Sequence, residues 1–230
     1  MSDTTTTGPY WIQTATGRAF DLESPTGCVS GFDLSHALSG LNRFGGHLTA
    51  SYSVAQHSVL CAALIWRRTR DRIATFHALL HDAHEAYIGD LKSPVKAMIN
   101  AWAPGKLAEI ERRIDEAIWA WAGLAEPDPE VARLIKTADL ELLFWERDRW
   151  LPPTPQPWVG EGTAKRLVAA DFGADWEPGF VECWERGVST VVFSRILRTL
   201  RGDVAGGTFD VGVNKTGWSA VFRGLAREVE

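Results

Sequence analysis

Apolar residues recur at helical spacing through most of this 230-residue chain. In segment 53–68, for example, Val54, Leu60 and Leu64 fall on one face of a helix with 3.6 residues per turn. The same kind of pattern predicts further helices over 33–39, 71–87, 105–122, 130–149 and 178–201. Helices with one apolar face bury that face against other helices, so the pattern predicts an all-α helical bundle.

Local signals predict where several elements begin and end. Asp33 is a candidate N-cap for the helix over 33–39, and Pro127-Asp128-Pro129 is a typical start for the helix over 130–149. A weak alternation around a Thr-Gly turn predicts a small β-hairpin over residues 10–22. Residues 43–46 are expected to form a loop, and Ser93-Pro94 to begin a turn or a helix.

Length and composition favour one domain with a substantial core, since 45% of the residues are hydrophobic. We expect a core over 1–150, with residues 1–9 disordered. The stretch 151–230 should add a proline-rich loop, a C-terminal helix and a tail that pack on this core. Tryptophans in helices 105–122 and 130–149 suit the core or a subunit interface, so we expect a homo-oligomer.

The same data argue against several classes of partner. A formal charge of −5 without a basic stripe disfavours binding to a nucleic-acid backbone. No apolar run is long enough for a membrane span or a signal peptide, so no membrane partner is expected. Three scattered cysteines do not suit a disulfide scaffold, which favours the reducing cytoplasm.

The run His81-Asp82-Ala83-His84-Glu85 is the strongest candidate for chemistry. If residues 71–87 form one helix, positions 81, 82 and 85 fall within about 100° of arc. An imidazole and a carboxylate side by side are the donors that a divalent transition metal prefers. One helix cannot complete such a site, so further ligands from other helices are required.

His57, on the preceding predicted helix, and Asp139, on a later one, are the candidates for those ligands. Asp139 lies among Ala138, Leu140 and Leu142, and a buried carboxylate without a partner is costly. Taken singly, each residue has an ordinary explanation: a lone histidine is more often packed in the core than bound to a metal. The order His, His-Asp, Asp on three predicted helices is far more specific.

This pattern resembles the HD-domain superfamily of metal-dependent phosphohydrolases. More narrowly, the run from His81 to Gly89-Asp90-Leu91 and Lys96 resembles the signature of bacterial 5′-deoxynucleotidases and of phage relatives that include dATP triphosphohydrolases. The upstream segment from Arg43-Phe44-Gly45-Gly46 to Ser58 is similar to the phage-like branch. The resemblance extends over residues 16–150 and does not include the tail.

The resemblance implies a role for each matching position. His57, His81, Asp82 and Asp139 would be the metal ligands. Glu85 would orient or deprotonate the attacking water, and Asp90 would hold the sugar or assist the water. Arg43 and Phe44 would contact the substrate, although Phe44 stands where relatives often carry tryptophan, which leaves the sugar or base contact open. Lys96 could touch phosphate or be an ordinary solvated lysine.

The expected activity is cleavage of the 5′ phosphoester of a small-molecule 2′-deoxynucleotide. Two His and two Asp ligands suit one divalent transition metal, namely Co, Mn, Zn, Fe or Ni, better than Mg, with room for a second, weaker Mg or Mn on the phosphates. Monophosphate and triphosphate substrates both remain open, as does base preference. Two further hypotheses are an HD-fold hydrolase of another phosphorylated signal nucleotide and a non-catalytic nucleotide-binding regulator. If the gene is phage-encoded, the compartment would be the host cytoplasm.

Overall fold

Helix α2 (Val54–Thr69) is the central element of the fold. A computed structural model of the chain describes residues 8–172 and 182–204, and every residue of α2 from Val54 to Trp66 is buried in it. Helices α1 (Gly31–Gly40), α3 (Arg72–Leu80), α7 (Pro129–Trp150), α8 (Ala169–Phe172) and α9 (Arg186–Val204) all pack against α2. Because α2 is covered on all sides, it carries apolar or small residues around most of its circumference.

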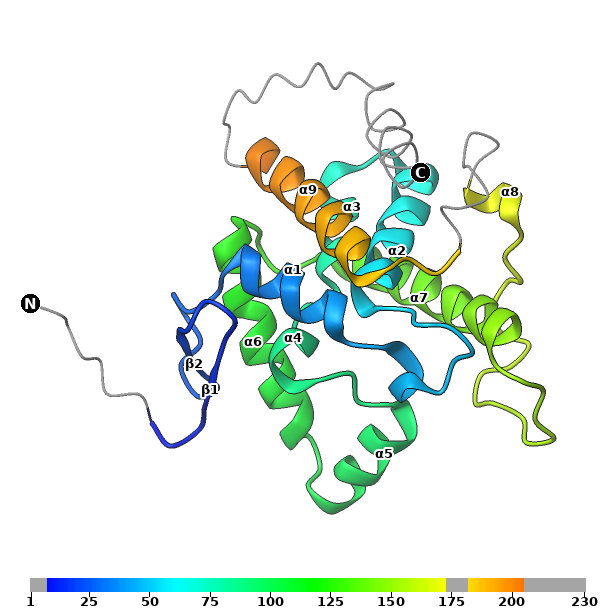
Figure 1. The fold of residues 1–230 in the computed structure, drawn as a ribbon, viewed down its shortest axis with the longest axis horizontal. Helices are drawn as coiled ribbons and strands as arrows, with labels where there is room; N and C mark the ends of the chain where they lie inside the picture. Colours follow the sequence, from blue (N-terminus) through cyan, green and yellow to red (C-terminus); the bar gives the residue numbers. More distant parts are fainter. Residues whose placement is uncertain (1–7, 173–181, 205–230) are drawn as a thin grey trace, which may run out of the picture.

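The remaining elements lie mainly to one side of this centre, to the left of and below α2 (Figure 1). They are strands β1 (Trp11–Gln13) and β2 (Ala19–Asp21), the 3₁₀ turn η1 (Arg43–Gly46), and helices α4 (Glu85–Ile88), α5 (Ser93–Trp102) and α6 (Lys106–Ala122). The predicted all-α fold with a small N-terminal β-hairpin is confirmed. The predicted loop over 43–46 is a short 3₁₀ turn, and Ser93-Pro94 begins a full helix.

An aromatic pair attaches the hairpin to helix α4. Strands β1 and β2 are antiparallel, with Trp11 opposite Asp21. The Phe20 side chain is fully buried, and its ring stacks on Tyr87 of α4 with centroids 3.5 Å apart and an interplanar angle of 10°. Because α4 follows directly on the His81-Asp82 pair, this stack fixes the candidate motif against the N-terminal hairpin.

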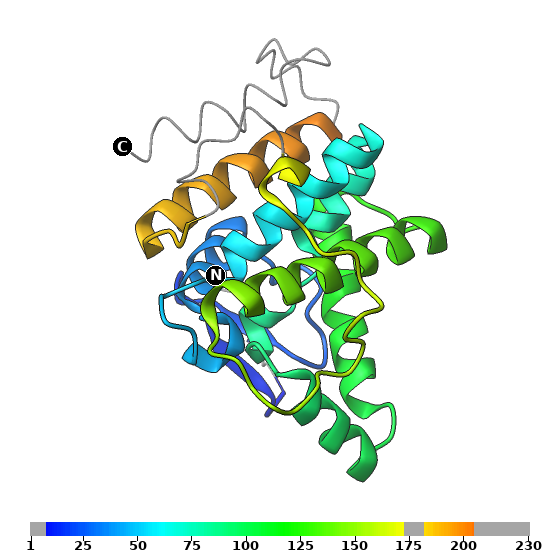
Figure 2. The ribbon, with the colours of Figure 1, turned by 90° about the vertical axis from the view of Figure 1, so that its right-hand side faces the viewer.

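Helix α9 closes the bundle from the C-terminal side. It lies across α2 with α7 on the other side of α2 (Figure 2), and it also packs on α1 and α3. The predicted helix over 178–201 begins too early, because residues 182–185 are not helical and α9 starts at Arg186. Residues 178–181, the tail beyond 204 and residues 1–7, which were expected to be disordered, lie outside the described residues.

The prediction of a single helix over 71–87 is wrong. Helix α3 ends at Leu80, and α4 starts at Glu85. Between them the backbone forms tighter i to i+3 hydrogen bonds, from Ala83 N–H to the Leu80 carbonyl at 3.0 Å and from Glu85 N–H to the Asp82 carbonyl at 3.1 Å. The local tightening belongs to a 3₁₀-like turn and turns the His81-Asp82 pair relative to the axis of α3.

The predicted N-cap of α1 is also wrong. Ser30 caps the helix by accepting from the backbone N–H of Asp33. The Asp33 carboxylate instead accepts from the N–H and the hydroxyl of Thr16, both at 2.8 Å. Asp33 therefore ties α1 to the hairpin turn, a long-range contact that local sequence does not reveal.

The start of helix α7 agrees with the sequence. Asp128 accepts from the Glu130 N–H at 2.8 Å and starts α7, as the Pro-Asp-Pro signal predicts. Helix α6 ends at Ala122, and the following Gly123 has a φ of 76°, a left-handed conformation that glycine adopts without strain.

Within the described residues, no helix is both long and apolar enough to cross a membrane.

Replacing Phe20 by alanine should destabilise the protein by about 3–5 kcal/mol, because it removes a fully buried ring and its stack on Tyr87. The free energy of unfolding from urea denaturation measures this effect. Trp11→Ala is the matched control in the same hairpin: its side chain is 47% exposed, and its loss should change stability by at most about 0.5 kcal/mol. Equal effects from both changes would contradict the anchoring role of Phe20.

Candidate metal centre

Three elements bring the four predicted ligands together. His57 comes from the first turn of α2, His81 and Asp82 from the turn after α3, and Asp139 from the middle of α7. One donor atom of each side chain lies within 4.8 Å of the donor atoms of the other three. This His₂Asp₂ cluster could hold a metal ion, as the sequence predicts.

The distances within the cluster suit a shared cation. His57 Nε2 lies 3.2 Å from Asp139 Oδ1 and 3.6 Å from Asp82 Oδ2, and His81 Nε2 lies 3.2 Å from Asp82 Oδ2. Donors that bind one ion at about 2.0–2.2 Å stand roughly 3–3.5 Å apart as neighbours. The two Nε2 atoms approach each other to 3.2 Å. Two ring nitrogens that both point lone pairs inward repel each other unless a proton or a cation lies between them.

Hydrogen bonds on the opposite side of each ring orient the imidazoles. His81 Nδ1 lies 2.8 Å from the carbonyl oxygen of Ala78, which can only accept, so Nδ1 donates. His57 Nδ1 lies 2.6 Å from Glu146 Oε1 and donates to that carboxylate. Both rings therefore present Nε2 to the cluster. Partners of this kind fix the tautomer and the direction of metal-binding histidines.

Glu146 is the residue of this site that the sequence prediction missed. Its side chain is fully buried and accepts from His57, from the Tyr52 hydroxyl at 2.7 Å and from Arg43 Nε at 3.0 Å. Burial opposes ionisation, but Arg43 and His57 lower the pKa of Glu146, so it is a carboxylate at neutral pH. The spacing of Glu146 from Asp139 could have indicated its role in the sequence. The two residues are seven positions apart, which places both on one face of a helix.

The charges of the cluster reinforce one another. Burial opposes ionisation of Asp82, yet His81, His57 and Arg43 hold its pKa well below the usual range. Asp139 is affected in the same way, mainly by its hydrogen bond with His57. Burial and Arg43 disfavour the charged form of His57, but Glu146 and Asp139 outweigh them and raise its pKa to about 9. The two aspartates are therefore available as anionic ligands.

Arg43 lies beside the cluster on η1, and Phe44 follows it in the same turn. The Arg43 guanidinium is buried, and besides its bond to Glu146 its NH1 lies 3.5 Å from Asp82 Oδ2. Phe44 has a φ of 56°, a left-handed conformation that is strained for a residue with a side chain. Its ring is half-buried and stands 6.0 Å from the ring of Trp158, in the loop that follows α7. Strained backbone of this kind often occurs at binding sites.

Of the two predicted catalytic residues, Glu85 is the first residue of α4, and Asp90 lies in the loop after it. Glu85 is buried, and its Oε2 atom has no hydrogen-bond partner among the described residues. Burial, together with the charges of Asp82 and Asp90, raises the pKa of Glu85 to about 9. Asp90 is half-buried, and burial is the main cause that raises its pKa as well. The negative charge of Asp82 contributes to the raised pKa of both carboxyl groups.

Lys96, the third predicted substrate contact, comes from α5. Its Nζ lies 2.9 Å from Glu111 Oε1, so the ammonium is already paired. Beside it, His84 Nδ1 lies 3.0 Å from Asp115 Oδ1. Lys96, His84 and Asp115 line the same cavity as His81. The sequence did not connect these residues because Glu111 and Asp115 lie on α6, remote from the motif.

Replacing Glu146 by glutamine should lower the affinity for a divalent metal about 10- to 100-fold, because the amide no longer orients His57 as a carboxylate does. A competition titration with a chromophoric chelator and Co²⁺ measures this loss. Glu141→Gln is the matched control, since Glu141 is also buried on α7 but pairs with Arg68, away from the cluster. The same loss of affinity in both variants would contradict the role of Glu146.

In the metal-stripped protein, the free energy of unfolding should depend on pH in the way that the raised pKa of Glu85 implies. Between its ordinary pKa of 4.5 and about 9, the folded state binds more protons than the unfolded chain, so stability falls as the pH rises through this window. Glu85→Gln removes this contribution. Near pH 4.5 we expect the variant and the wild type to have the same free energy of unfolding. As the pH rises toward about 9, the variant should become progressively more stable than the wild type. Urea denaturation at a series of pH values measures the difference.

Glu116→Gln is the control for that series, because Glu116 is exposed on α6 and should leave the pH dependence of the wild type intact. A constant difference between the wild type and Glu85→Gln at all pH values would contradict a raised pKa of Glu85.

Two proteins from bacteria are similar in sequence to this chain. No protein-family profile matches the sequence. The chain is 38% identical over 115 residues to Uncharacterized protein YfdR of Escherichia coli (strain K12). The aligned region covers 50% of this chain and 57% of that protein, so the chain spans less than two thirds of that relative. It is 37% identical over 139 residues to Uncharacterized protein RCAP_rcc00048 of Rhodobacter capsulatus, which covers 56% of this chain and 67% of that protein. The chain therefore belongs to the same family as the Rhodobacter capsulatus protein.

Proposed function

We propose that this protein is a metal-dependent phosphohydrolase that cleaves the 5′ phosphoester of 2′-deoxynucleotides. It would act as a 5′-deoxynucleotidase or as a deoxynucleoside triphosphate triphosphohydrolase. The observation that carries the proposal is the His₂Asp₂ cluster of His57, His81, Asp82 and Asp139. The buried Glu85 carboxyl lies close enough to Asp82 for the Asp82 charge to raise its pKa. The resemblance of the motif to HD-domain enzymes supplies the reaction class.

The His₂Asp₂ donor set fits Co, Mn, Zn, Fe or Ni better than Mg, with a second, weaker Mg or Mn on the substrate phosphates. Such an ion, when bound, polarises a phosphoryl oxygen and lowers the pKa of water. The protein's own contribution is to hold the two imidazoles and two carboxylates in place before the ion arrives. Glu146 and the Ala78 carbonyl do this for the two histidines.

Arg43 would bind the phosphoryl group. Its Nε and NH1 are held by Glu146 and Asp82, and a guanidinium has five N–H donors, so donors remain for a phosphoryl oxygen. A planar guanidinium that is already fixed in position loses little freedom when it binds an anion. Lys96 would add positive charge nearby, partly offset by its pairing with Glu111.

Glu85 would hold the attacking water and take its proton. Its unpartnered Oε2 is available to a water molecule. A cation held by Asp82 would oppose the negative charge that helps to raise the pKa of Glu85, so that the carboxylate form could accept the proton. Asp90 would bind the sugar or assist the same water. Phe44 would pack against the sugar, because it follows Arg43 directly and its ring is half exposed. A non-catalytic nucleotide-binding protein would have no need of a buried, unpaired carboxyl beside its metal ligands.

The first test is a product assay with Co²⁺ or Mn²⁺ and each of dAMP, dATP, AMP and ATP, resolved by chromatography. We expect a deoxynucleoside from at least one deoxynucleotide: phosphate as the second product identifies a 5′-deoxynucleotidase, and intact triphosphate identifies a triphosphohydrolase. Glu85→Gln should lower kcat about 10²- to 10⁴-fold with unchanged metal content, because it removes the proton acceptor.

Glu116→Gln serves as the matched control for activity, since this exposed glutamate lies outside the site. Loss of metal from Glu85→Gln would mean that the residue supports the cluster rather than the reaction. No product from any of the four nucleotides, with metal bound, would favour a different phosphorylated substrate or a binding role.

A further inference from the structure

A cavity of about 290 Å³ opens onto the metal cluster from the side of α6 and α7. His81, Asp82 and Asp139 border it at one end, so a ligand in the cavity would touch the candidate metal site. Small-molecule pockets span roughly 300–1,000 Å³, so this cavity is large enough for one ring system but not for a whole nucleotide. It therefore suits one part of a substrate whose remainder lies over the cluster.

Two buried imidazoles in the cavity wall have ring nitrogens without partners. His77 is 5% exposed and His84 is 6% exposed, and both line the cavity. The Nδ1 atom of His77 and the Nε2 atom of His84 have no hydrogen-bond partner among the described residues. Glu111 Oε1 lies 3.9 Å from His84 Nε2, a distance that is too long for a hydrogen bond. Buried polar atoms are nearly always paired, so these two await a ligand or a water.

The cavity lining also contains apolar side chains. Leu80, Trp119, Pro127, Ala132 and Ile135 line it. The half-buried Trp119 ring stands 6.1 Å from the His77 ring, nearly perpendicular to it at 77°. An aromatic wall with polar atoms at one edge suits a flat heterocycle, which stacks through its face and hydrogen-bonds through its edge.

The charges in the cavity disfavour a phosphate chain. Lys96 pairs with Glu111 at 2.9 Å and Lys136 pairs with Asp139 at 2.7 Å, so both ammonium groups are neutralised. Asp115 also lines the cavity, and its carboxylate pairs with His84, so neither lysine of the lining is left free for a phosphate chain. A neutral heterocycle does not depend on such a free positive charge.

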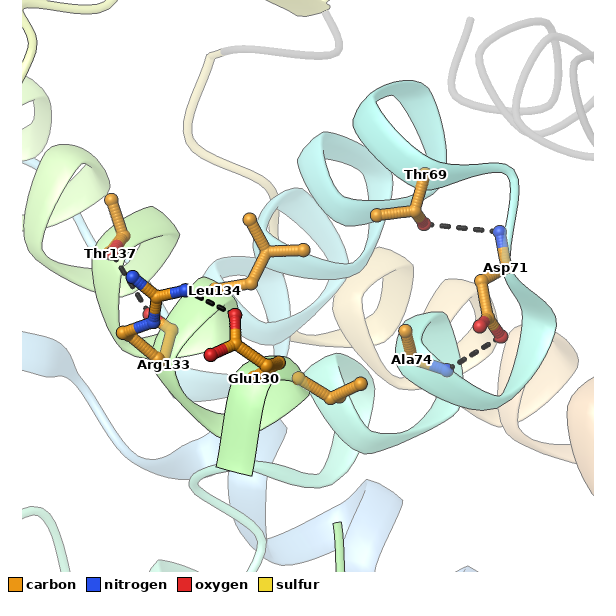
Figure 3. A pocket seen from close by; sticks show the side chains of 8 residues that line it. Thr69, Asp71, Ala74, Glu130, Arg133, Leu134 and Thr137 are labelled. Carbon is orange, nitrogen blue, oxygen red and sulfur yellow. Dashed lines mark hydrogen bonds and ion pairs between the residues drawn. The ribbon is translucent and has the colours of Figure 1, made fainter. Parts of the chain in front are cut away.

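A second cavity, of about 350 Å³, makes a useful contrast (Figure 3). It lies between α7 and the turn from α2 to α3, and no residue of the metal cluster lines it. Its polar side chains are used within the chain: Thr69 accepts from the Asp71 N–H, Asp71 from the Ala74 N–H, and Glu130 pairs with Arg133. This cavity therefore offers a ligand no unsatisfied buried group.

We propose that the 290 Å³ cavity is a nucleobase subsite, in which Trp119 stacks on the base and His77 and His84 bind its polar edge. The inference rests on the proposed function, because the phosphate of the same nucleotide is taken to lie at the metal cluster. It adds three candidate specificity-determining residues to the four predicted metal ligands and the predicted catalytic pair.

The test compares a substrate that has a base with one that lacks it. Wild-type protein and Trp119→Ala would be assayed with dAMP, dGMP, dCMP and dTMP, and with 2-deoxyribose 5-phosphate. Loss of one base stack should reduce kcat/KM for the preferred nucleotide roughly 5- to 100-fold, and leave kcat/KM for the base-free phosphate unchanged. Trp119→Phe should restore most of the loss, because it keeps an aromatic face.

Trp102→Ala is the matched control, since Trp102 is 77% exposed on α5 and does not line the cavity. His77→Gln, which keeps a polar side chain of similar reach, provides a second variant if Trp119→Ala does not fold, and it should also affect only substrates with a base. Equal losses on dAMP and on 2-deoxyribose 5-phosphate would overturn the proposal, because they indicate a general structural effect.

Calorimetry with free deoxynucleosides separates this inference from the proposed function. Deoxynucleoside binding that Trp119→Ala weakens would support the subsite even if no nucleotide is hydrolysed, which would reject only the proposed function. Hydrolysis of nucleotides without such binding, and without base dependence, would reject only the subsite. Binding of inorganic tripolyphosphate that Lys136→Ala weakens, with no binding of deoxynucleosides, would identify a polyphosphate pocket and overturn the proposal.

Discussion

The buried Glu146 carboxylate is the interaction on which the candidate site depends. Removing a carboxylate from water costs several kcal/mol unless hydrogen bonds and an opposite charge compensate for it. Here His57, Tyr52 and Arg43 all donate to it. These donors come from α2 and from the segment before it, whereas Glu146 lies on α7. One buried charge thus aligns a candidate metal ligand and a candidate phosphate-binding arginine on separate parts of the chain.

The break between α3 and α4 is the second feature that shapes the site. A continuous helix would have kept His81, Asp82 and Glu85 on one face, but the 3₁₀-like turn after Leu80 changes their relative directions. Asp82 then contributes to the metal cluster, while Glu85 begins a new helical turn with one carboxyl oxygen unpaired. The stack of Phe20 on Tyr87 supports this arrangement from the hairpin side.

Much of the fold and the central residues of the site could be predicted. Apolar spacing located α2, α6 and α7, and the Pro-Asp-Pro signal located the start of α7, because these features depend on neighbours a few residues apart. The four candidate metal ligands were found from their order along the chain and from the resemblance to the HD motif. The cap of α1 and the role of Asp33 were missed, because Asp33 bonds to Thr16, seventeen positions earlier.

By itself, the sequence determined the helical class of the fold, the hairpin and the four side chains that meet in the metal cluster, since periodicity and donor chemistry are properties of the residues alone. Only the tertiary structure decided what surrounds them. It placed Glu146 behind His57, raised the pKa of Glu85 through burial beside Asp82, and brought His77, His84 and Trp119 around one cavity. Burial, charge and cavity shape arise from contacts between distant segments, and no local pattern encodes them.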